Sequence, residues 1–206
     1  MSQYPIPAQT LRIENVVVNS RFIATIGRAD TVPDAKAFIQ AVRDEMPDAT
    51  HHVYAFKVGY GGSITEGMTD DGEPSGTAGP PVLAVLRGAD LGDVVIVVTR
   101  YFGGTKLGTG GLVRAYGGAA KDALAALPVE LKIEKRYIGI TIAYTFYERL
   151  KLLLEAHHAT IDLEEFAGDV TVYATLPVDQ LEPLRAALLE LTAGQVEPVE
   201  LGQPES

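Results

Sequence analysis

The chain of 206 residues contains no cysteine. This excludes disulfide bonds and thiolate zinc sites, and it suits a reducing compartment. Apolar runs such as Val94–Val98 are far shorter than the roughly 20 residues that a membrane-spanning helix needs. The N-terminal stretch has no basic region followed by an apolar core, so we expect no signal peptide. The sequence therefore predicts a cytoplasmic protein that does not enter a membrane.

Basic residues are also scarce, with 17 Lys and Arg against 27 Asp and Glu and a net charge of −10. A generic nucleic-acid-binding protein is usually basic. The charge is uneven, however: residues 1–128 hold 11 basic and 13 acidic residues (−2), whereas residues 129–206 hold 6 and 14 (−8). The stretch from Val94 to Lys121 contains no acid and four cations: Arg100, Lys106, Arg114 and Lys121. Any contact with an anion is expected in this stretch.

Length and pattern predict two domains, residues 1–128 and 129–206, because Pro128 ends a helix at the point where the charge balance changes. In the first part, a continuous β-branched run at 93–99 indicates a strand buried on both faces. The second part alternates in the order βαββαβ, which is the ferredoxin-like arrangement. Its elements are expected at residues 138–146, 150–157, 161–163, 170–176, 181–191 and 196–201.

Two long loops of opposite charge flank the buried strand. The first, TDDGEPSGTAGPP at residues 69–81, has three acids, and the second, RYFGGTKLGTGG at residues 100–111, has five glycines and two cations. A glycine-rich loop between a strand and a helix lets backbone N–H groups converge on an anion. It matches neither the Walker nor the dinucleotide-binding fingerprint. The alternative is a tight loop whose Arg100 and Lys106 are merely solvated.

The acids of the first loop have two interpretations. Asp70, Asp71 and Glu73 could hold Mg²⁺ or Ca²⁺, which prefer carboxylate oxygens. We favour the alternative, in which they pair with Arg100 or Lys106 or cap the helix that follows. No cofactor is indicated.

The sequence shows no catalytic constellation. His51 and His52 are adjacent on a predicted strand, so they point to opposite faces and cannot chelate one ion together. There is no cysteine nucleophile, and no serine stands in a GxSxG elbow. Enzyme activity stays open, with a binding protein as the expectation.

The motifs TDDGEPSGTAG and VIVVTRYFGGTKLGTGGLVRAY resemble those of the IMPACT (YigZ) family. THHVYAF is also similar, although Val53 stands where family members often carry cysteine. The resemblance covers nearly the whole chain. It implies an α+β protein: an N-terminal left-handed βαβ domain, shared with a ribosomal-protein domain and with domain IV of elongation factor G, followed by a ferredoxin-like domain. Eukaryotic members regulate translation as binding proteins.

Together these observations predict a translation-associated regulatory protein that contacts RNA or the ribosome. The expected anion-binding residues are Arg100, Lys106, Gly104, Gly108, Gly110, Gly111, Arg114 and Lys121. Supporting roles are expected for Asp71, Glu73, His52 and Tyr101.

Two alternatives stay open. One is an enzyme that uses a phosphate or a nucleotide and binds Mg²⁺ through the acidic loop. The other is a module whose acidic C-terminal domain binds a basic protein. The sequence indicates neither the identity of the RNA or protein partner nor the oligomeric state.

Overall fold

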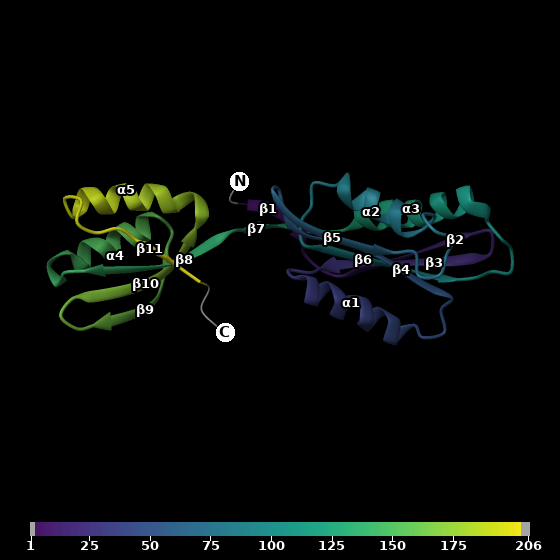
Figure 1. The fold of residues 1–206 in the computed structure, drawn as a ribbon, viewed down its shortest axis with the longest axis horizontal. Coiled ribbons are helices and arrows are strands. Elements are labelled where there is room, and N and C mark those ends of the chain that lie inside the picture. Colours follow the sequence, from purple (N-terminus) through teal and green to yellow (C-terminus); the bar gives the residue numbers. More distant parts are fainter. Residues whose placement is uncertain (1–2, 203–206) are drawn as a thin grey trace. The chain divides into compact units, whose positions relative to one another are not determined.

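The computed structural model describes residues 3–202 (Figure 1). The chain divides into two compact units, one of residues 4–132 and one that contains the residues from Ile133 on. Each unit has its own apolar core. Both units mix helices with antiparallel strands, which confirms the expected α+β class. The division between the units falls at Lys132, four residues after Pro128, where the sequence indicated the domain boundary.

The first unit is built on a five-stranded sheet of order β2-β3-β6-β4-β5 in which all neighbours are antiparallel. Its strands are β2 (Leu11–Val17), β3 (Ser20–Arg28), β4 (His51–Tyr60), β5 (Ser63–Thr69) and β6 (Val94–Tyr101). The central strand β6 is buried from Val94 to Arg100. This confirms the prediction from its continuous apolar run, because only a strand covered on both faces buries consecutive side chains.

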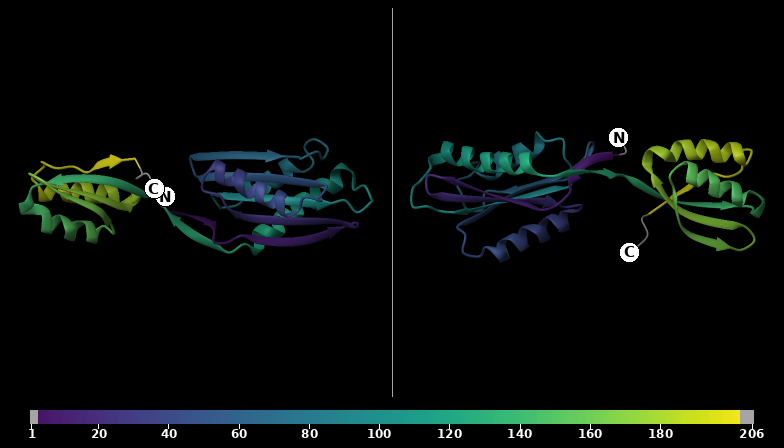
Figure 2. Two further views of the ribbon diagram at one scale, coloured as in Figure 1. Left: turned by 90° about the horizontal axis from the view of Figure 1, so that it is seen from below. Right: turned by 180° about the vertical axis from the view of Figure 1, so that it is seen from behind.

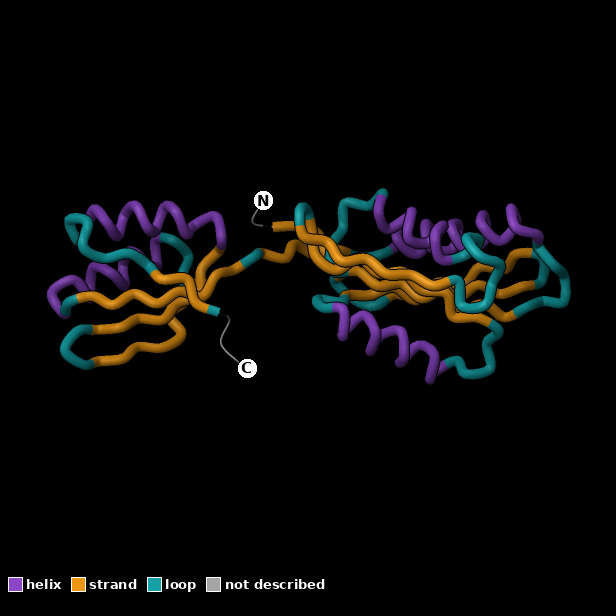
Figure 3. Tube along the Cα trace, in the orientation of Figure 1, coloured by secondary structure: helices purple, strands orange, loops and turns teal. Residues whose placement is uncertain are grey.

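Helices cover both faces of this sheet, as Figure 3 shows. Helix α1 (Val32–Glu45) begins at Thr31, whose hydroxyl accepts a hydrogen bond from the backbone N–H of Asp34. It packs on one face, with Val95 and Val97 of β6. Helices α2 (Gly79–Arg87) and α3 (Gly108–Ala126) pack on the other, over the alternate residues of β6.

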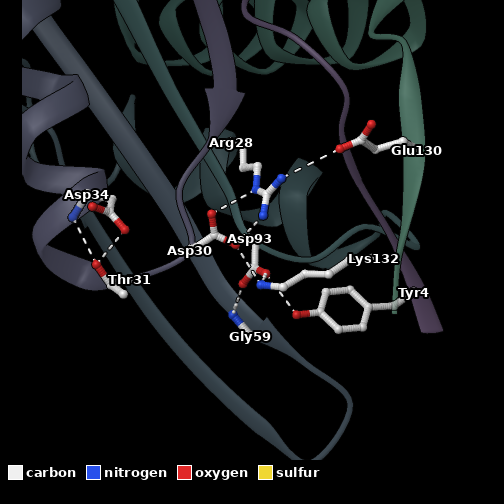
Figure 4. Close-up of polar contacts among 9 residues, drawn as sticks. All are labelled: Tyr4, Arg28, Asp30, Thr31, Asp34, Gly59, Asp93, Glu130 and Lys132. Carbon is white, nitrogen blue, oxygen red and sulfur yellow. Dashed lines mark hydrogen bonds and ion pairs between the residues drawn. The ribbon is translucent and has the colours of Figure 1, made fainter. Parts of the chain in front are cut away.

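The strands β1 (Gln3–Pro7) and β7 (Val129–Ile133) pair with each other in a separate two-stranded sheet. Buried Asp93 anchors them to the first unit (Figure 4). Its carboxylate accepts hydrogen bonds from the Tyr4 hydroxyl at 2.8 Å, the Lys132 ammonium at 2.5 Å and the Gly59 N–H at 2.7 Å. Burial alone would lower the pKa of Lys132, but its bonds to Asp30 and Asp93 outweigh burial and raise it.

This anchor leads to a prediction about the domain boundary. A fragment of residues 1–134 should fold alone, and a fragment of residues 1–128 should be less stable by more than about 1 kcal/mol, because it lacks the cation that compensates buried Asp93. Thermal melting of the two fragments measures the difference. If the longer fragment is unfolded while the full chain is folded, the two cores do not fold independently.

The second unit carries a four-stranded antiparallel sheet of order β11-β8-β10-β9. Numbered within the unit, that order is 4-1-3-2, which belongs to the ferredoxin-like βαββαβ arrangement predicted from the sequence. Helices α4 (Tyr147–Ala156) and α5 (Leu181–Leu191) lie over the apolar side of the sheet (Figure 2). The strands are β8 (Lys135–Ile142), β9 (Thr160–Phe166), β10 (Val170–Pro177) and β11 (Val199–Leu201).

The first strand of this unit is shorter than predicted. Tyr144–Phe146 form a turn of 3₁₀ helix that leads into α4 instead of continuing β8. The apolar alternation misled the prediction because Tyr144 packs against Phe166 and donates a hydrogen bond to the Ala167 carbonyl, so it is held outside a sheet. In the described part of the chain, no helix is both long and apolar enough to cross a membrane.

Candidate functional site

The two loops singled out in the sequence meet at the start of α3. Together they enclose a pocket of about 330 Å³, here named the loop pocket. It is lined by Glu73, Pro74, Arg100, Phe102, Lys106, Leu107, Gly108, Thr109 and Leu112. The antiparallel pairings of β4 with β5 and with β6 place the ends of β5 and β6 near each other, which brings the acidic and basic loops together.

A buried ion pair forms one wall of the loop pocket. Arg100 is 4% exposed, and its Nη1 donates to Glu73 Oε1 at 2.6 Å while its Nη2 donates to Ser20 at 3.3 Å. The guanidinium lies 5.4 Å from the ring centres of both Phe22 and Phe102. Its Nε is buried and has no hydrogen-bond partner within residues 3–202. The pairing with Glu73 agrees with the favoured expectation that an acid of the first loop pairs with Arg100, and burial makes Arg100 part of the pocket wall.

Tyr116 of α3 completes this pair. Its hydroxyl donates to Glu73 Oε1 at 2.7 Å, and its side chain is fully buried. Burial, followed by the hydrogen bond to the Glu73 carboxylate, raises the pKa of Tyr116, so the phenol stays neutral and remains a donor. One carboxylate thus links the acidic loop, β6 and α3.

Asp71 does not take the partner that the sequence suggested. Its carboxylate accepts from Arg43 of α1 at 2.9 Å and from the backbone N–H of His52 at 2.6 Å. Lys106 forms no ion pair with any residue between 3 and 202 and is exposed. We expected Asp71 and Glu73 to orient Arg100 and Lys106. Glu73 does bind Arg100, whereas Asp71 binds Arg43 and so connects the acidic loop to α1.

Asp70 caps helix α2. Its two oxygens accept from the backbone N–H groups of Gly76, Ala78 and Gly79 at 2.8, 3.0 and 2.8 Å. Burial would raise the pKa of Asp70, but these hydrogen bonds together outweigh it and lower the pKa. All three acids of the loop thus bind donors of the protein itself. Within residues 3–202, no cluster of three or more His, Asp or Glu residues could hold a metal ion.

These contacts predict the response to metal. Addition of Mg²⁺ should leave the melting temperature unchanged, because Asp70, Asp71 and Glu73 are already bound by N–H and O–H donors. Differential scanning fluorimetry with increasing MgCl₂, and NaCl of matched ionic strength as control, measures this. A concentration-dependent rise with MgCl₂ alone would show a divalent site and favour the enzyme alternative.

The histidines lie on opposite faces of β4, as expected, but the ring at the site is that of His51 rather than His52. The imidazole of His51 reaches the site: its Nδ1 lies 2.7 Å from the Asp71 carbonyl oxygen and its Nε2 3.8 Å from Glu73. The ring of His52 lies on the α1 face, where Nδ1 contacts the Thr99 hydroxyl at 3.1 Å. Burial lowers the pKa of His52, although the nearby Asp71 opposes this.

The aromatic residue at the pocket is Phe102 rather than Tyr101. The Tyr101 hydroxyl donates to Asp48 at 2.9 Å, and Arg21 lies over its ring, so Tyr101 belongs to the α1 face. Phe102 is 46% exposed and lines the loop pocket. An aromatic residue beside the paired glycines of a strand-to-helix loop is the signal that could have identified it.

Glycines shape the start of α3. Gly108, its first residue, has φ of +69°, a conformation that side chains other than glycine rarely adopt. Gly104 also has a positive φ, and open space surrounds the positions that Cβ atoms would occupy at Gly104, Gly108 and Gly110. At Gly111, by contrast, an added Cβ atom would lie 3.0 Å from the Cβ atom of Leu107. Among residues 3–202 no side chain caps α3, so its first N–H groups remain available for a ligand.

Two further hollows adjoin α3, one beside the β2–β3 turn at Val17 and Val18 and one beside α2. One of about 270 Å³ shares Leu107 with the loop pocket and includes Gly111 and Arg114. The other, of about 710 Å³, shares Arg114 and lies between α2 and α3, with Gly117 and Lys121. We name this series, including the loop pocket, the α3 groove. Arg114 and Lys121 are exposed and, like Lys106, pair with no acid of the described chain, so the groove brings together three of the four predicted cations.

Known protein families and relatives match both units of the chain. The sequence model of the Impact N-terminal domain matches residues 18–124, and a domain of unknown function, DUF1949, matches residues 140–195. The chain is 36% identical to the IMPACT family member YigZ of Escherichia coli, over 96% of this chain and 97% of that protein. It is 34% identical to an IMPACT family member of Haemophilus influenzae, over 98% and 100%.

A solved structure agrees with the fold. A crystal structure of a hypothetical protein covers 99% of this chain and 100% of its own, with a TM-score of 0.75 and 35% sequence identity. The similarity therefore extends over both units.

Proposed function

Since the chain belongs to the IMPACT family, we propose that it is a translation-associated binding protein that holds single-stranded RNA along the α3 groove. The role in translation rests on the family. The RNA contact is supported by one observation above all: Lys106, Arg114 and Lys121 line three adjoining hollows beside α3, and none of the three has an acid partner among residues 3–202.

The geometry of the groove suits a flexible polyanion. Phosphates recur along a nucleic-acid strand, and proteins that bind single strands without sequence preference combine a positive groove with exposed aromatic rings. The groove has such a ring, Phe102, at its first hollow and cations at all three. The net charge of −10 opposes approach from a distance, but most of it (−8) belongs to residues 129–206. Binding is therefore local and strongly dependent on salt.

The salt dependence of RNA binding tests the proposal. Removal of one cation that binds a phosphate should lower the slope of log K against log salt concentration by about 0.7 for a single strand. Lys106→Ala and Arg114→Ala should each have this effect with little change in stability, because both side chains are exposed. Fluorescence anisotropy with an oligouridylate at several salt concentrations measures the slope.

Lys36→Ala is the matched control, because Lys36 is an exposed cation on α1, across the sheet from the groove. It should leave the slope at the parent value. If Lys106→Ala and Arg114→Ala both bind RNA as the parent does, or if the parent binds no RNA at low salt, the RNA proposal is wrong.

A protein partner for the second unit is the other candidate. The open face of its sheet has a hollow of about 340 Å³ that includes Tyr173 and Val199, and Tyr137 stacks on Tyr173 with ring centres 6.2 Å apart. With a net charge of −8 in residues 129–206, this unit suits a basic partner. Capture of a basic protein by the full chain, without RNA binding, would favour this candidate.

A further inference from the structure

We infer, building on the proposed function, that the loop pocket holds one nucleotide unit, with its base stacked on Phe102 and its phosphate at the N-terminus of α3. The volume of about 330 Å³ lies at the lower end of the range, about 300–1,000 Å³, of small-molecule sites. Phe102, Leu107 and Leu112 supply an apolar part of the lining, and Arg100, Lys106 and Gly108 supply donors and positive charge.

The phosphate end is formed by backbone and by Lys106. Helix α3 runs for 19 residues from Gly108 and has no side-chain cap in the described part of the chain, so its first N–H groups and its positive dipole end are available to an anion. Nothing lies within 4 Å of the position that a Cβ atom would take at Gly110, so a ligand can approach the backbone there. Lys106 is exposed just before the helix and adds a cation to this end of the pocket.

A second and independent observation points to a ligand in the same pocket. Arg100 is 4% exposed and lines the pocket, yet its Nε donor has no acceptor within residues 3–202. Buried donors are nearly always hydrogen-bonded, so an orphan donor on a residue that lines the pocket fits an acceptor supplied from outside the chain. A phosphate or ribose oxygen provides one, and Glu73 already compensates the charge of Arg100, so the ligand oxygen need only accept a hydrogen bond.

The base end is the ring of Phe102. The ring is 46% exposed although the Arg100 guanidinium lies over it, 5.4 Å from the ring centre. An exposed ring at the mouth of an anion site allows stacking of any base, because every base has a flat π-face. The pocket should therefore distinguish nucleotides from inorganic phosphate while discriminating weakly between bases.

Calorimetric titration of the full chain tests this inference with three probes: uridine 5′-monophosphate, inorganic phosphate and an oligouridylate. Phe102→Ala should weaken binding of the mononucleotide and of the oligonucleotide by about 5- to 150-fold, which is the usual range for loss of one stacked base. It should leave the affinity for inorganic phosphate and the salt slope unchanged, because no charge is removed. Phe102→Trp should restore tight binding, and Phe166→Ala, which alters an exposed ring of the other unit, should have no effect.

The outcomes separate this inference from the proposed function. The inference that a nucleotide stacks on Phe102 is wrong if Phe102→Ala binds both nucleotide probes as the parent does, or if Phe102→Trp binds as weakly as Phe102→Ala. In either case, salt-dependent RNA binding would still support the RNA proposal. Phe102-dependent binding of the mononucleotide without RNA binding supports the pocket, identifies a free nucleotide as its ligand and overturns the RNA proposal. Absence of binding by every probe overturns both.

Discussion

Replacing Glu73 by glutamine is expected to lower the free energy of unfolding by about 3–5 kcal/mol, because it leaves a buried guanidinium without its counter-charge. Arg100 is 4% exposed, and its strongest contact is the 2.6 Å hydrogen bond to Glu73. The same substitution weakens the bond from the Tyr116 hydroxyl. Urea denaturation followed by circular dichroism, with linear extrapolation to water, measures the destabilisation.

Glu66→Gln is the matched control for this prediction. Glu66 pairs with Arg87 at 2.6 Å, the same separation as in the buried pair, but the Arg87 side chain is 61% exposed. Exposed pairs contribute about 0–1 kcal/mol, so this variant should remain within about 1 kcal/mol of the parent. Similar destabilisation of the two variants would mean that Arg100 and Glu73 are not desolvated in solution, and the loop pocket would not have a fixed wall.

Ile96→Ala is expected to cost about 2–5 kcal/mol, through the transfer free energy of the removed atoms and the cavity that remains. Ile96 is fully buried in the central strand β6, within the core that α2 and α3 cover. Val16→Ala, at a side chain 66% exposed on the edge strand β2 of the same sheet, should cost much less. Urea unfolding of both variants gives the comparison, and a destabilisation well below 1 kcal/mol for Ile96→Ala would contradict the central position of β6.

The sequence predicted the positions of the two loops better than the hydrogen-bond partners of their charged residues. Glycine content and charge identified both loops, because backbone conformation and local charge are properties of neighbouring residues. The partner of each acid depends on elements far apart in the chain: Asp71 meets Arg43 of α1, 28 residues away. Strand periodicity placed His51 and His52 on opposite faces, but only the covering helices decide which face carries the site.

The same distinction explains the misread elements. The strands β1 and β7 went unrecognised because they are short and because their polar anchor, buried Asp93, lies far from both in the sequence. Burial of Arg100 was not predictable either, since it requires Glu73, Ser20 and two phenylalanines from separate segments of the chain. Long-range packing therefore buries Arg100 in the wall of the loop pocket, where its Nε has no hydrogen-bond partner among residues 3–202.

The central claim is that RNA occupies the α3 groove, and ultraviolet crosslinking in living cells tests it most directly. The full chain is purified under denaturing conditions after irradiation, and the crosslinked peptides are mapped by mass spectrometry. We expect RNA attached to peptides that contain Phe102, Lys106 or Arg114, and much less crosslinked RNA in the Lys106→Ala, Arg114→Ala double variant. Recovery of no RNA above the unirradiated control, or crosslinks confined to residues 133–202, would contradict the claim.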